Sequence, residues 1–338
     1  MRIAQISTMS SPVREDATGS VESLVWLLTG ELTRMGHEVT VFGVEGSLPS
    51  SEFVVTLPGS YGVNGAPDDW HLCEWINLSR AIAESGRFDV LHSHAYLWGI
   101  PLEKLARAPM IHTVHIVPET SSAFLWKSSP RSNVTAISRH QWCSYPELHP
   151  VATIPHGVDA THFTFREVPD DYVCYLGRFT SGKGPLQAIA VAKSLGLRLL
   201  LAGPEDQYYR DHVEPLVDGQ MIEYVGFLQG ADRDRLLGGA RALLYPIQYP
   251  ESFGLVLVEA MLCGTPVVAM RLGAVPEIVD EGVTGYSVDT SQEFEHAVLK
   301  AFTLDRARIK QVASARFSVE QMAQGYASAY ASVCKGNR

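Results

Sequence analysis

The chain has 338 residues, 46% hydrophobic and 19% charged, a composition typical of one large or two ordinary globular domains that excludes disordered, fibrous and small disulfide-stapled classes. Its 27 Lys and Arg residues stand against 37 Asp and Glu residues, a net charge of −10. We therefore expect neither a nucleic-acid partner nor charge-driven docking on an anionic membrane.

Five scattered cysteines, none spaced as C-x-x-C, predict neither a disulfide framework nor a thiolate zinc site and favour a reducing, cytoplasmic location. The first residues run directly into a strand pattern without the apolar core of a signal peptide. No apolar stretch approaches the ~20 residues that span a bilayer. We therefore expect no transmembrane segment.

The first half of the chain alternates strand and helix patterns. Residues 2–7 form an apolar strand pattern, a loop with Gly19 and Ser20 follows, and a helical pattern at 21–35 leads into a second strand at 38–44. Further short apolar runs end in polar residues at 89–92, 110–115 and 134–138. This order predicts a parallel α/β sheet, whose strands present their carboxyl ends to the ligand crevice.

A second alternation begins after a charged, proline-containing stretch at 166–171. The tail at 319–334 carries apolar residues at helical spacing, and its length suits a helix that packs across both domains. The sequence predicts two βα domains, residues 1–165 together with a final helix at about 318–338, and residues 166–317. The strands of the second domain are expected at 172–176, 198–202, 222–225, 242–246 and 266–269.

The most informative segment is 250–261, in which Glu251 and Glu259 stand eight residues apart around a very apolar run. The run predicts a buried helix that begins near Gly254, where free backbone amides receive a phosphate or a sugar hydroxyl. Glu259 then lies inside a helix that otherwise avoids charge, and a buried carboxylate needs a partner such as two ribose hydroxyls. The alternative is that both carboxylates only cap and solvate the helix ends.

The segment 175–184 is a strand end followed by a glycine-rich loop that contains Gly177, Arg178 and Lys183. A planar guanidinium and a point-charge ammonium together suit a diphosphate on which negative charge accumulates as it leaves. The loop lacks the G-x-x-x-x-G-K-[ST] spacing of a Walker A motif. A solvated basic loop is the alternative.

These two segments resemble family 4 of the retaining glycosyltransferases. The stretch from Glu251 to Glu259 is similar to the family's E-x7-E motif, and the loop at 177–184 is similar to its phosphate loop. The resemblance spans essentially the whole chain and is strongest in its second half. Further stretches match in the family's order at 201–204, 225–227, 259–268, 273–279 and 282–285.

The resemblance implies a GT-B fold, in which two Rossmann-like domains face each other across a cleft and a C-terminal helix crosses back to the first domain. It implies an acceptor site in the first domain and a donor site mostly in the second. There, Glu259 holds the ribose, Arg178 and Lys183 hold the diphosphate, and Glu251 holds the sugar. The implied donor-binding residues are Gly19, Ser20, Gly177, Arg178, Lys183, Val225, Gly226, Phe227, Glu251, Phe253, Gly254, Leu255 and Glu259.

In the first half, Thr113-Val114-His115 resembles the family's T-x-H element, whose histidine lies near the reacting carbon. The implied catalytic residues are His115, Glu251, Arg178 and Lys183. The implied border of the acceptor pocket is His92, His94, His112 and Trp126. A metal site shared by these three histidines with His115, or satisfied histidines at strand ends, are the alternatives.

Two motifs depart from what the family shows, and a third segment resembles a motif of another fold. One departure is His156, where the family commonly has Asn before Gly-Val-Asp; this segment is expected to form an interdomain turn. Where the family has two glycines near the donor phosphates, this chain has Gly19 and then Ser20, whose hydroxyl is itself a hydrogen-bond donor. Asp232-Arg233-Asp234 resembles the metal-binding D-x-D of the other glycosyltransferase fold. It opens a helical run, however, where acidic residues favour the helix dipole, so we expect no metal there.

The resemblance predicts metal-independent transfer of a sugar from a nucleotide diphosphate, with retention of configuration, by front-face displacement and without a cofactor. UDP-sugars are preferred as donors, with GDP-sugars as the alternative. Residues 1–165 hold 10 Lys and Arg against 16 Asp and Glu, net −6. This half lacks the basic face of relatives that glycosylate membrane lipids, so we expect a soluble carbohydrate or natural-product acceptor. Alternative functions are a nucleotide-sugar epimerase or phosphorylase of the same fold, and a non-catalytic nucleotide-sugar-binding protein.

Overall fold

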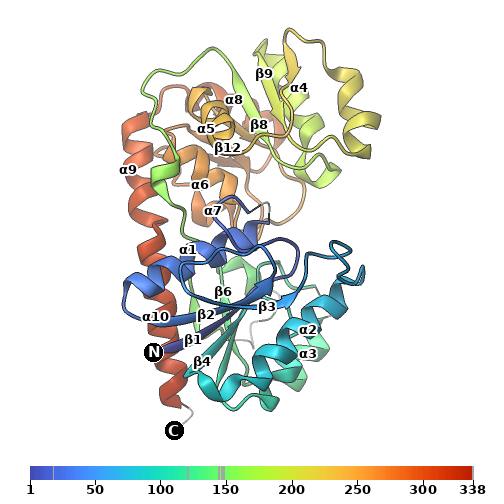
Figure 1. Cartoon of the computed structure of the whole chain (residues 1–338). Coiled ribbons are helices and arrows are strands. Elements are labelled where there is room, and N and C mark those ends of the chain that lie inside the picture. The colour runs from blue at the N-terminus through green and yellow to red at the C-terminus, as the bar shows by residue number, and fades with distance from the viewer. Residues whose placement is uncertain (18, 120–121, 144, 146–148, 337–338) are drawn as a thin grey trace. The chain divides into compact units, whose positions relative to one another are not determined.

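Two compact units make up the computed structural model, which describes residues 1–338 except 18, 120–121, 144, 146–148 and 337–338 (Figure 1). Unit 1 comprises Met1–Gly157 and Val319–Arg338, and unit 2 comprises Val158–Ser318. Each unit has its own parallel sheet flanked by helices, which confirms the predicted α/β class.

The strands of unit 1 are β1 (Arg2–Ile6), β2 (Glu38–Val44), β3 (Glu52–Leu57), β4 (Val90–Ser93), β5 (Met110–Thr113), β6 (Asn133–Ala136) and β7 (Ala152–Thr153). Its helices are α1 (Ser20–Arg34), α2 (Trp70–Ala83), α3 (Ala123–Ser128) and α10 (Val319–Gly336). The strand order is β3-β2-β1-β4-β5-β6-β7, with parallel neighbours throughout. The order reverses between β1 and β4, and open α/β sheets bind ligands at the carboxyl side of such a switch point.

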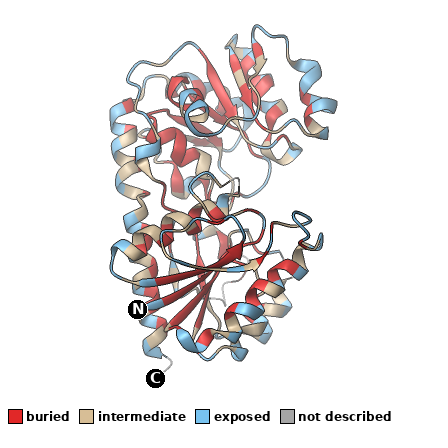
Figure 2. Cartoon of the chain, in the orientation of Figure 1, coloured by how far each residue is buried: buried red, intermediate tan, exposed pale blue. Residues whose placement is uncertain are grey.

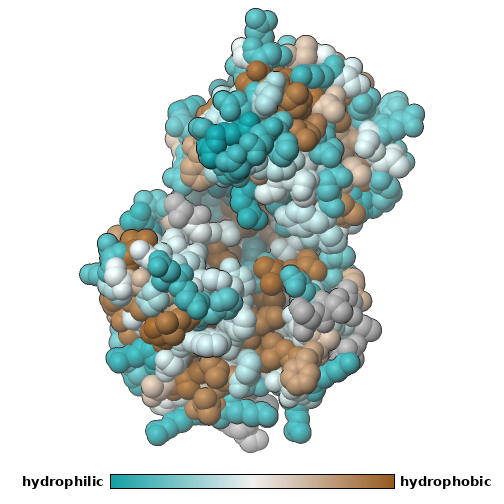
Figure 3. Space-filling model, turned by 90° about the vertical axis from the view of Figure 1, so that its right-hand side faces the viewer, coloured by the Kyte–Doolittle hydropathy of each residue, from teal (hydrophilic) through white to brown (hydrophobic). Residues whose placement is uncertain are grey.

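Helices cover both faces of this sheet because the side chains of each strand alternate between the faces. In β1, Ile3 packs with apolar residues of α1 and α10, whereas Ala4 and Ile6 pack with α2. Burial runs along the strands, and the outer sides of the helices are exposed (Figure 2). On the face that carries α2 and α3, hydrophobic side chains also reach the surface in several patches (Figure 3).

Unit 2 repeats the same topology in one continuous segment. Its strands are β8 (Val173–Leu176), β9 (Leu199–Ala202), β10 (Ile222–Tyr224), β11 (Leu243–Tyr245), β12 (Val267–Met270) and β13 (Gly285–Val288). Its helices are α4 (Pro185–Leu195), α5 (Gly230–Gly239), α6 (Leu255–Leu262), α7 (Val275–Ile278), α8 (Ser291–Ala301) and α9 (Arg306–Arg316). The parallel order β10-β9-β8-β11-β12-β13 places the switch point between β8 and β11.

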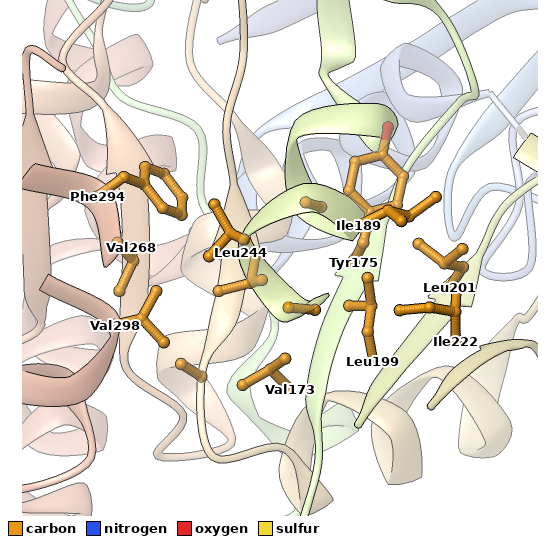
Figure 4. Packing of buried hydrophobic residues seen from close by; sticks show 14 of the residues in the cluster. Val173, Tyr175, Ile189, Leu199, Leu201, Ile222, Leu244, Val268, Phe294 and Val298 are labelled. Atoms are coloured by element: carbon orange, nitrogen blue, oxygen red, sulfur yellow. The ribbon is translucent and has the colours of Figure 1, made fainter. Parts of the chain in front are cut away.

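The core of unit 2 lies between one face of its sheet and helices α4 and α8 (Figure 4). Val173 and Tyr175 of β8 belong to one buried hydrophobic cluster with Ile189 of α4 and with Phe294 and Val298 of α8. Each of these side chains is at most 2% exposed, and full burial of such a side chain stabilises a fold by about 1.5–3 kcal/mol. A rigid sheet therefore supports the loops at its carboxyl edge.

Local sequence signals set the ends of several helices. Pro185 opens α4 at the first turn, where its missing N–H costs nothing. Thr290 and Glu293 form a reciprocal capping box at the start of α8. Among the helices of the described residues, none combines the length and the apolar character needed to cross a membrane.

Candidate functional site

The switch point of the unit 2 sheet brings together residues from the two donor motifs. The loop after β8 carries Lys183, and the loop after β11 carries Glu251. Nζ of Lys183 lies 2.6 Å from Oε2 of Glu251 and 3.1 Å from the hydroxyl of Tyr245, the last residue of β11. The Tyr245 hydroxyl donates to the same Oε2. An ammonium, a carboxylate and a phenol thus share one largely buried cluster, which we call the Lys183 cluster.

Charge balance within the Lys183 cluster keeps its carboxylate ionised. Burial alone raises the pKa of Glu251, but the charge and hydrogen bond of Lys183 and the hydrogen bond from Tyr245 outweigh it, so the net pKa is lowered. Nζ of Lys183 also lies 5.1 Å from the centre of the Tyr249 ring, within cation–π range. The cluster therefore presents fixed charges of both signs at the edge of the sheet.

Backbone contacts hold the Lys183 loop against the loop that follows β11. Gly184 has φ +74°, and a Cβ atom at this position would lie 2.0 Å from the carbonyl oxygen of Pro246, so only glycine fits. The amide of Gln248 donates to the carbonyl of Gly182 over 2.8 Å. These contacts explain how Lys183 and Glu251 meet although 68 residues separate them.

The second glutamate of the motif lies on α6 and is 7% exposed. Its Oε2 accepts from Nη2 of Arg233 on α5. Burial raises the pKa of Glu259, and the attraction of Arg233 only partly offsets it. Asp232 and Asp234 do lie on the predicted helix. Arg233, which lies between them, was not predicted as a site residue, although a buried glutamate in an apolar helix indicates that it needs a polar or cationic partner.

Helix α6 begins as the apolar run predicts. Gly254 precedes it with φ +87°, and no side chain caps this helix end, so its first amides are left for water or a ligand. A Cβ at 254 would lie 3.0 Å from Cδ1 of Leu257, which together with the positive φ favours glycine. Phe253 is buried and Leu255 is the first residue of the helix.

The remaining predicted donor residues follow neighbouring strands of the same sheet. Gly177 and Arg178 follow β8, and within the described residues the exposed Arg178 guanidinium has no carboxylate partner. Val225, Gly226 and Phe227 follow β10, and Phe227 is 60% exposed. The structure therefore places every donor residue predicted in the second half at or beside one edge of unit 2.

In unit 1, the loop after β1 closes around Glu22 of α1, which is 1% exposed. Its Oε1 accepts from the amides of Ser10 and Ser11 over 3.1 and 3.2 Å. The amide of Gly19 donates to Oγ of Ser11 over 3.2 Å, and Ser20 is exposed at the start of α1. The predicted donor residues Gly19 and Ser20 thus lie close in the chain to a buried carboxylate, Glu22, that was not predicted as a site residue.

A second buried carboxylate, Glu74 of α2, holds the adjoining part of this loop. Its Oε1 accepts from the amide of Met9 over 2.9 Å and from the hydroxyl of Tyr61 over 2.7 Å. Its Oε2 is buried and accepts no hydrogen bond within the described residues. Burial raises the pKa of Glu74 to about 7.

We expect wild type to lose stability relative to Glu74→Gln as the pH rises from about 5 to about 7. The pKa of Glu74 is higher in the folded state than in the unfolded state. Its contribution to the free energy of unfolding is therefore fully present below the unfolded-state pKa and is lost as the pH rises through about 7. The shift corresponds to a relative loss of up to about 3 kcal/mol. Urea unfolding at several pH values measures it, with the exposed Glu45→Gln as control. Parallel pH profiles of wild type and Glu74→Gln would contradict it.

A buried polar network lies between the unit 1 sheet and α10. Nδ1 of His92 lies 2.7 Å from the hydroxyl of Tyr330, and Nε2 lies 2.7 Å from Oγ1 of Thr113. Oγ1 of Thr113 also lies 3.0 Å from the hydroxyl of Tyr326. Burial lowers the pKa of His92 and of His94 well below the usual value, so both imidazoles are neutral at pH 7.

His115 lies at one end of this network. Its Nε2 is 3.0 Å from Nδ1 of His94, and its ring stacks on His156 with centres 5.3 Å apart. Burial lowers the pKa of His115 to about 3. Nothing near His156 in the chain links it to His115, so the sequence predicts only an interdomain turn there.

The other predicted acceptor residues lie apart from this group. His112 is buried, and its Nε2 lies 3.2 Å from Oε2 of Glu103. Trp126 is 1% exposed and packs edge-on against Trp142. Within the part of the chain that the structure describes, no three His, Cys, Asp or Glu side chains form a group able to bind one metal ion, so the four-histidine metal site is not assembled.

Comparison with known proteins shows the family and the fold of the chain. The family model described as Glycosyl transferases group 1 matches residues 161–316, and the one described as Glycosyltransferase Family 4 matches residues 21–162. A relative from Mycolicibacterium smegmatis named D-inositol 3-phosphate glycosyltransferase is 30% identical, over 96% of this chain and 87% of its own length.

Two solved structures share the fold. AviGT4, a glycosyltransferase involved in avilamycin A biosynthesis, has a TM-score of 0.75 at 24% identity and covers 99% of this chain and 98% of its own. HepE from Anabaena, in complex with UDP and glucose, has a TM-score of 0.73 at 20% identity and covers 98% of this chain and 100% of its own. The chain therefore belongs to family 4 of the glycosyltransferases and is an enzyme with the GT-B fold.

Proposed function

We propose that this glycosyltransferase moves a sugar from a UDP-sugar to a hydroxyl of a soluble carbohydrate or natural-product acceptor, with retention of configuration. The observation that carries the proposal is the Lys183 cluster at the switch point of unit 2, with Arg178 exposed on the same edge. Two cations at the carboxyl side of a parallel sheet suit a diphosphate. Support for UDP comes from the similar fold of HepE, which was solved with UDP.

In the proposed reaction, the bond between the sugar C1 and the diphosphate oxygen breaks while the acceptor oxygen bonds to C1 from the same face. The hydroxyl proton passes to the leaving phosphate oxygen. Lys183 and Arg178 stabilise the charge that develops on the diphosphate, the contribution that a divalent metal makes in other enzymes. The proposal therefore includes metal independence.

Glu251 and Glu259 have binding roles in this proposal. Glu251 is ionised and already accepts from Lys183 and Tyr245, which suits a carboxylate that orients sugar hydroxyls rather than one that attacks C1. Glu259 is buried beside Arg233 and accepts the ribose hydroxyls. His115, Gly19 and Ser20 lie in unit 1, which holds the acceptor in this proposal.

Thermal unfolding with a nucleotide panel tests the donor. We expect UDP to raise the melting temperature of wild type more than GDP, ADP, dTDP or NAD, because a ligand that binds only the folded state stabilises it. The shift is expected to be lost in Glu259→Ala and kept in Glu295→Ala, which removes a partly exposed carboxylate of α8. The proposal is refuted if only NAD raises the melting temperature, or if none of the nucleotides does.

Product analysis then tests the reaction. Incubation of the sugar donor with and without acceptors separates transfer, which needs the acceptor, from epimerisation, which does not. Binding without conversion would show a non-catalytic protein. The anomeric configuration of the product, read by NMR, tests retention.

A further inference from the structure

A buried glutamine determines how the histidines of unit 1 are protonated. Gln5 of β1 is fully buried on the face that α10 covers, and its Nε2 donates to the hydroxyl of Tyr330 over 3.0 Å. Its Oε1 lies 2.9 Å from Nε2 of His94. Because a carbonyl oxygen can only accept, Nε2 of His94 carries the hydrogen of this bond.

The hydrogen on His94 determines the hydrogen on His115. His94 is neutral, so with its hydrogen on Nε2 its Nδ1 is an acceptor. The partner of that Nδ1 is Nε2 of His115, 3.0 Å away, which must therefore donate. His115 then carries its single hydrogen on Nε2, and its Nδ1 has a lone pair.

That lone pair has no partner among the described residues. Nδ1 of His115 is buried and forms no hydrogen bond within the described residues. An unsatisfied buried polar atom costs about 1–3 kcal/mol, and such atoms call for an explanation where they occur. A hydroxyl of a bound ligand satisfies it, whereas a second acceptor does not.

We propose that Gln5 and His94 hold His115 in the Nε2–H tautomer, so that Nδ1 of His115 accepts a hydrogen bond from a hydroxyl of the bound sugar. The ligand in this inference rests on the proposed function. Gln5 and His94 are positioning residues, because each acts through the next imidazole. In the other tautomer His115 directs an N–H to this point, so the sugar hydroxyl can only accept there and its own hydrogen must point elsewhere.

Long-range ¹H–¹⁵N NMR of the unliganded wild type tests the tautomer directly, because it distinguishes protonated from bare imidazole nitrogens. The His115 signals are assigned as those lost in His115→Asn. We expect hydrogen on Nε2 and none on Nδ1. Hydrogen on Nδ1 in the wild type would overturn the inference, whatever the enzyme transfers.

Gln5→Met tests the cause, since methionine fills the same space without an acceptor oxygen. We expect a tautomer mixture at His115, a kcat about 10- to 100-fold lower and an almost unchanged donor KM, as for loss of a residue that orients a functional histidine.

Tyr326→Phe is the matched control for Gln5→Met. It removes an equally buried hydroxyl that contacts Thr113 and leaves the bonds between Gln5, His94 and His115 intact. It is expected to change stability but not the His115 tautomer. If Gln5→Met keeps the wild-type tautomer and matches Tyr326→Phe in kcat, the inference is wrong. If the wild type has the expected tautomer but transfers no sugar, only the proposed function fails.

Discussion

Lys183→Ala is expected to lower kcat by about 100- to 1,000-fold, the usual cost of removing one group that stabilises charge in the transition state. Donor affinity is expected to fall much less, because the charge that Lys183 meets grows as the diphosphate leaves. Its Nζ is held 2.6 Å from Glu251, so the ammonium is positioned before the donor arrives. Steady-state kinetics with the donor, together with calorimetric donor binding, separate the two effects.

Two further lysine variants control this measurement. Lys193→Ala removes an exposed lysine of α4, the helix that follows the Lys183 loop. This variant is expected to have wild-type kinetics. Lys183→Arg keeps the charge with a different geometry and is expected to retain partial activity. Equal losses of kcat and donor affinity in Lys183→Ala would show that the residue only binds the donor. Because Glu251 loses its buried counter-charge in Lys183→Ala, this variant could be destabilised. Thermal melts of the variant therefore check that it is folded under the assay conditions.

An unphosphorylated acceptor is expected to be used with a kcat/KM at least about 100-fold higher than its phosphorylated counterpart, although the relative from Mycolicibacterium smegmatis is named for an inositol phosphate. At the carboxyl edge of unit 1, backbone amides that could bind a phosphate already donate to Glu22, to Glu74 and to Asp69, the cap of α2. Like-charge juxtaposition costs several kcal/mol. Residues 1–103 contain no lysine, and all their arginines pair with carboxylates, namely Arg2, Arg14, Arg34, Arg80 and Arg87.

Matched pairs of acceptors measure this selectivity. Inositol, glucose and glucosamine are each compared with their phosphates, with the donor that the nucleotide panel identifies. At a pH above the raised pKa of Glu74, where its carboxylate is ionised, Glu74→Gln is expected to lower the ratio of the two kcat/KM values because it removes a buried negative charge. Glu45→Gln, at an exposed site, is expected to leave this ratio unchanged. If any phosphorylated acceptor is used as efficiently as its unphosphorylated partner, the prediction is wrong.

Regular elements with strong local signals were predictable from the sequence. The strand expected at 38–44 is β2 with the same bounds, and the expected tail helix is α10, two residues longer. The edge strand β3 was missed, because its side chains are mostly half-exposed and the pattern of apolar residues is weak. The periodicity of apolar residues indicates which side chains are buried, so a strand that is only partly buried at the edge of a sheet gives a weak pattern.

For the candidate site, residue types were predictable but their pairing was not. The sequence identified Lys183, Glu251 and Glu259 as candidate site residues, because charged side chains are unusual inside glycine-rich or apolar segments. It did not identify Arg233 as the partner of Glu259, or Gln5 as the partner of His94, because both contacts join residues that are far apart in the chain. Such contacts depend on register and helix packing, which no local pattern encodes.

Helix α10 belongs to unit 1, yet the whole of unit 2 precedes it in the chain. Tyr326 and Tyr330, both fully buried, complete the hydrogen bonds of Thr113, His92 and Gln5. During synthesis on the ribosome, unit 2 emerges whole and can fold at once, because domains fold as units when their residues are available. Unit 1 cannot complete its core until α10 has been synthesised, because α10 covers one apolar face of its sheet and supplies the hydrogen-bond partners of Thr113, His92 and Gln5. The half of the protein that is made first is thus the half that is finished last.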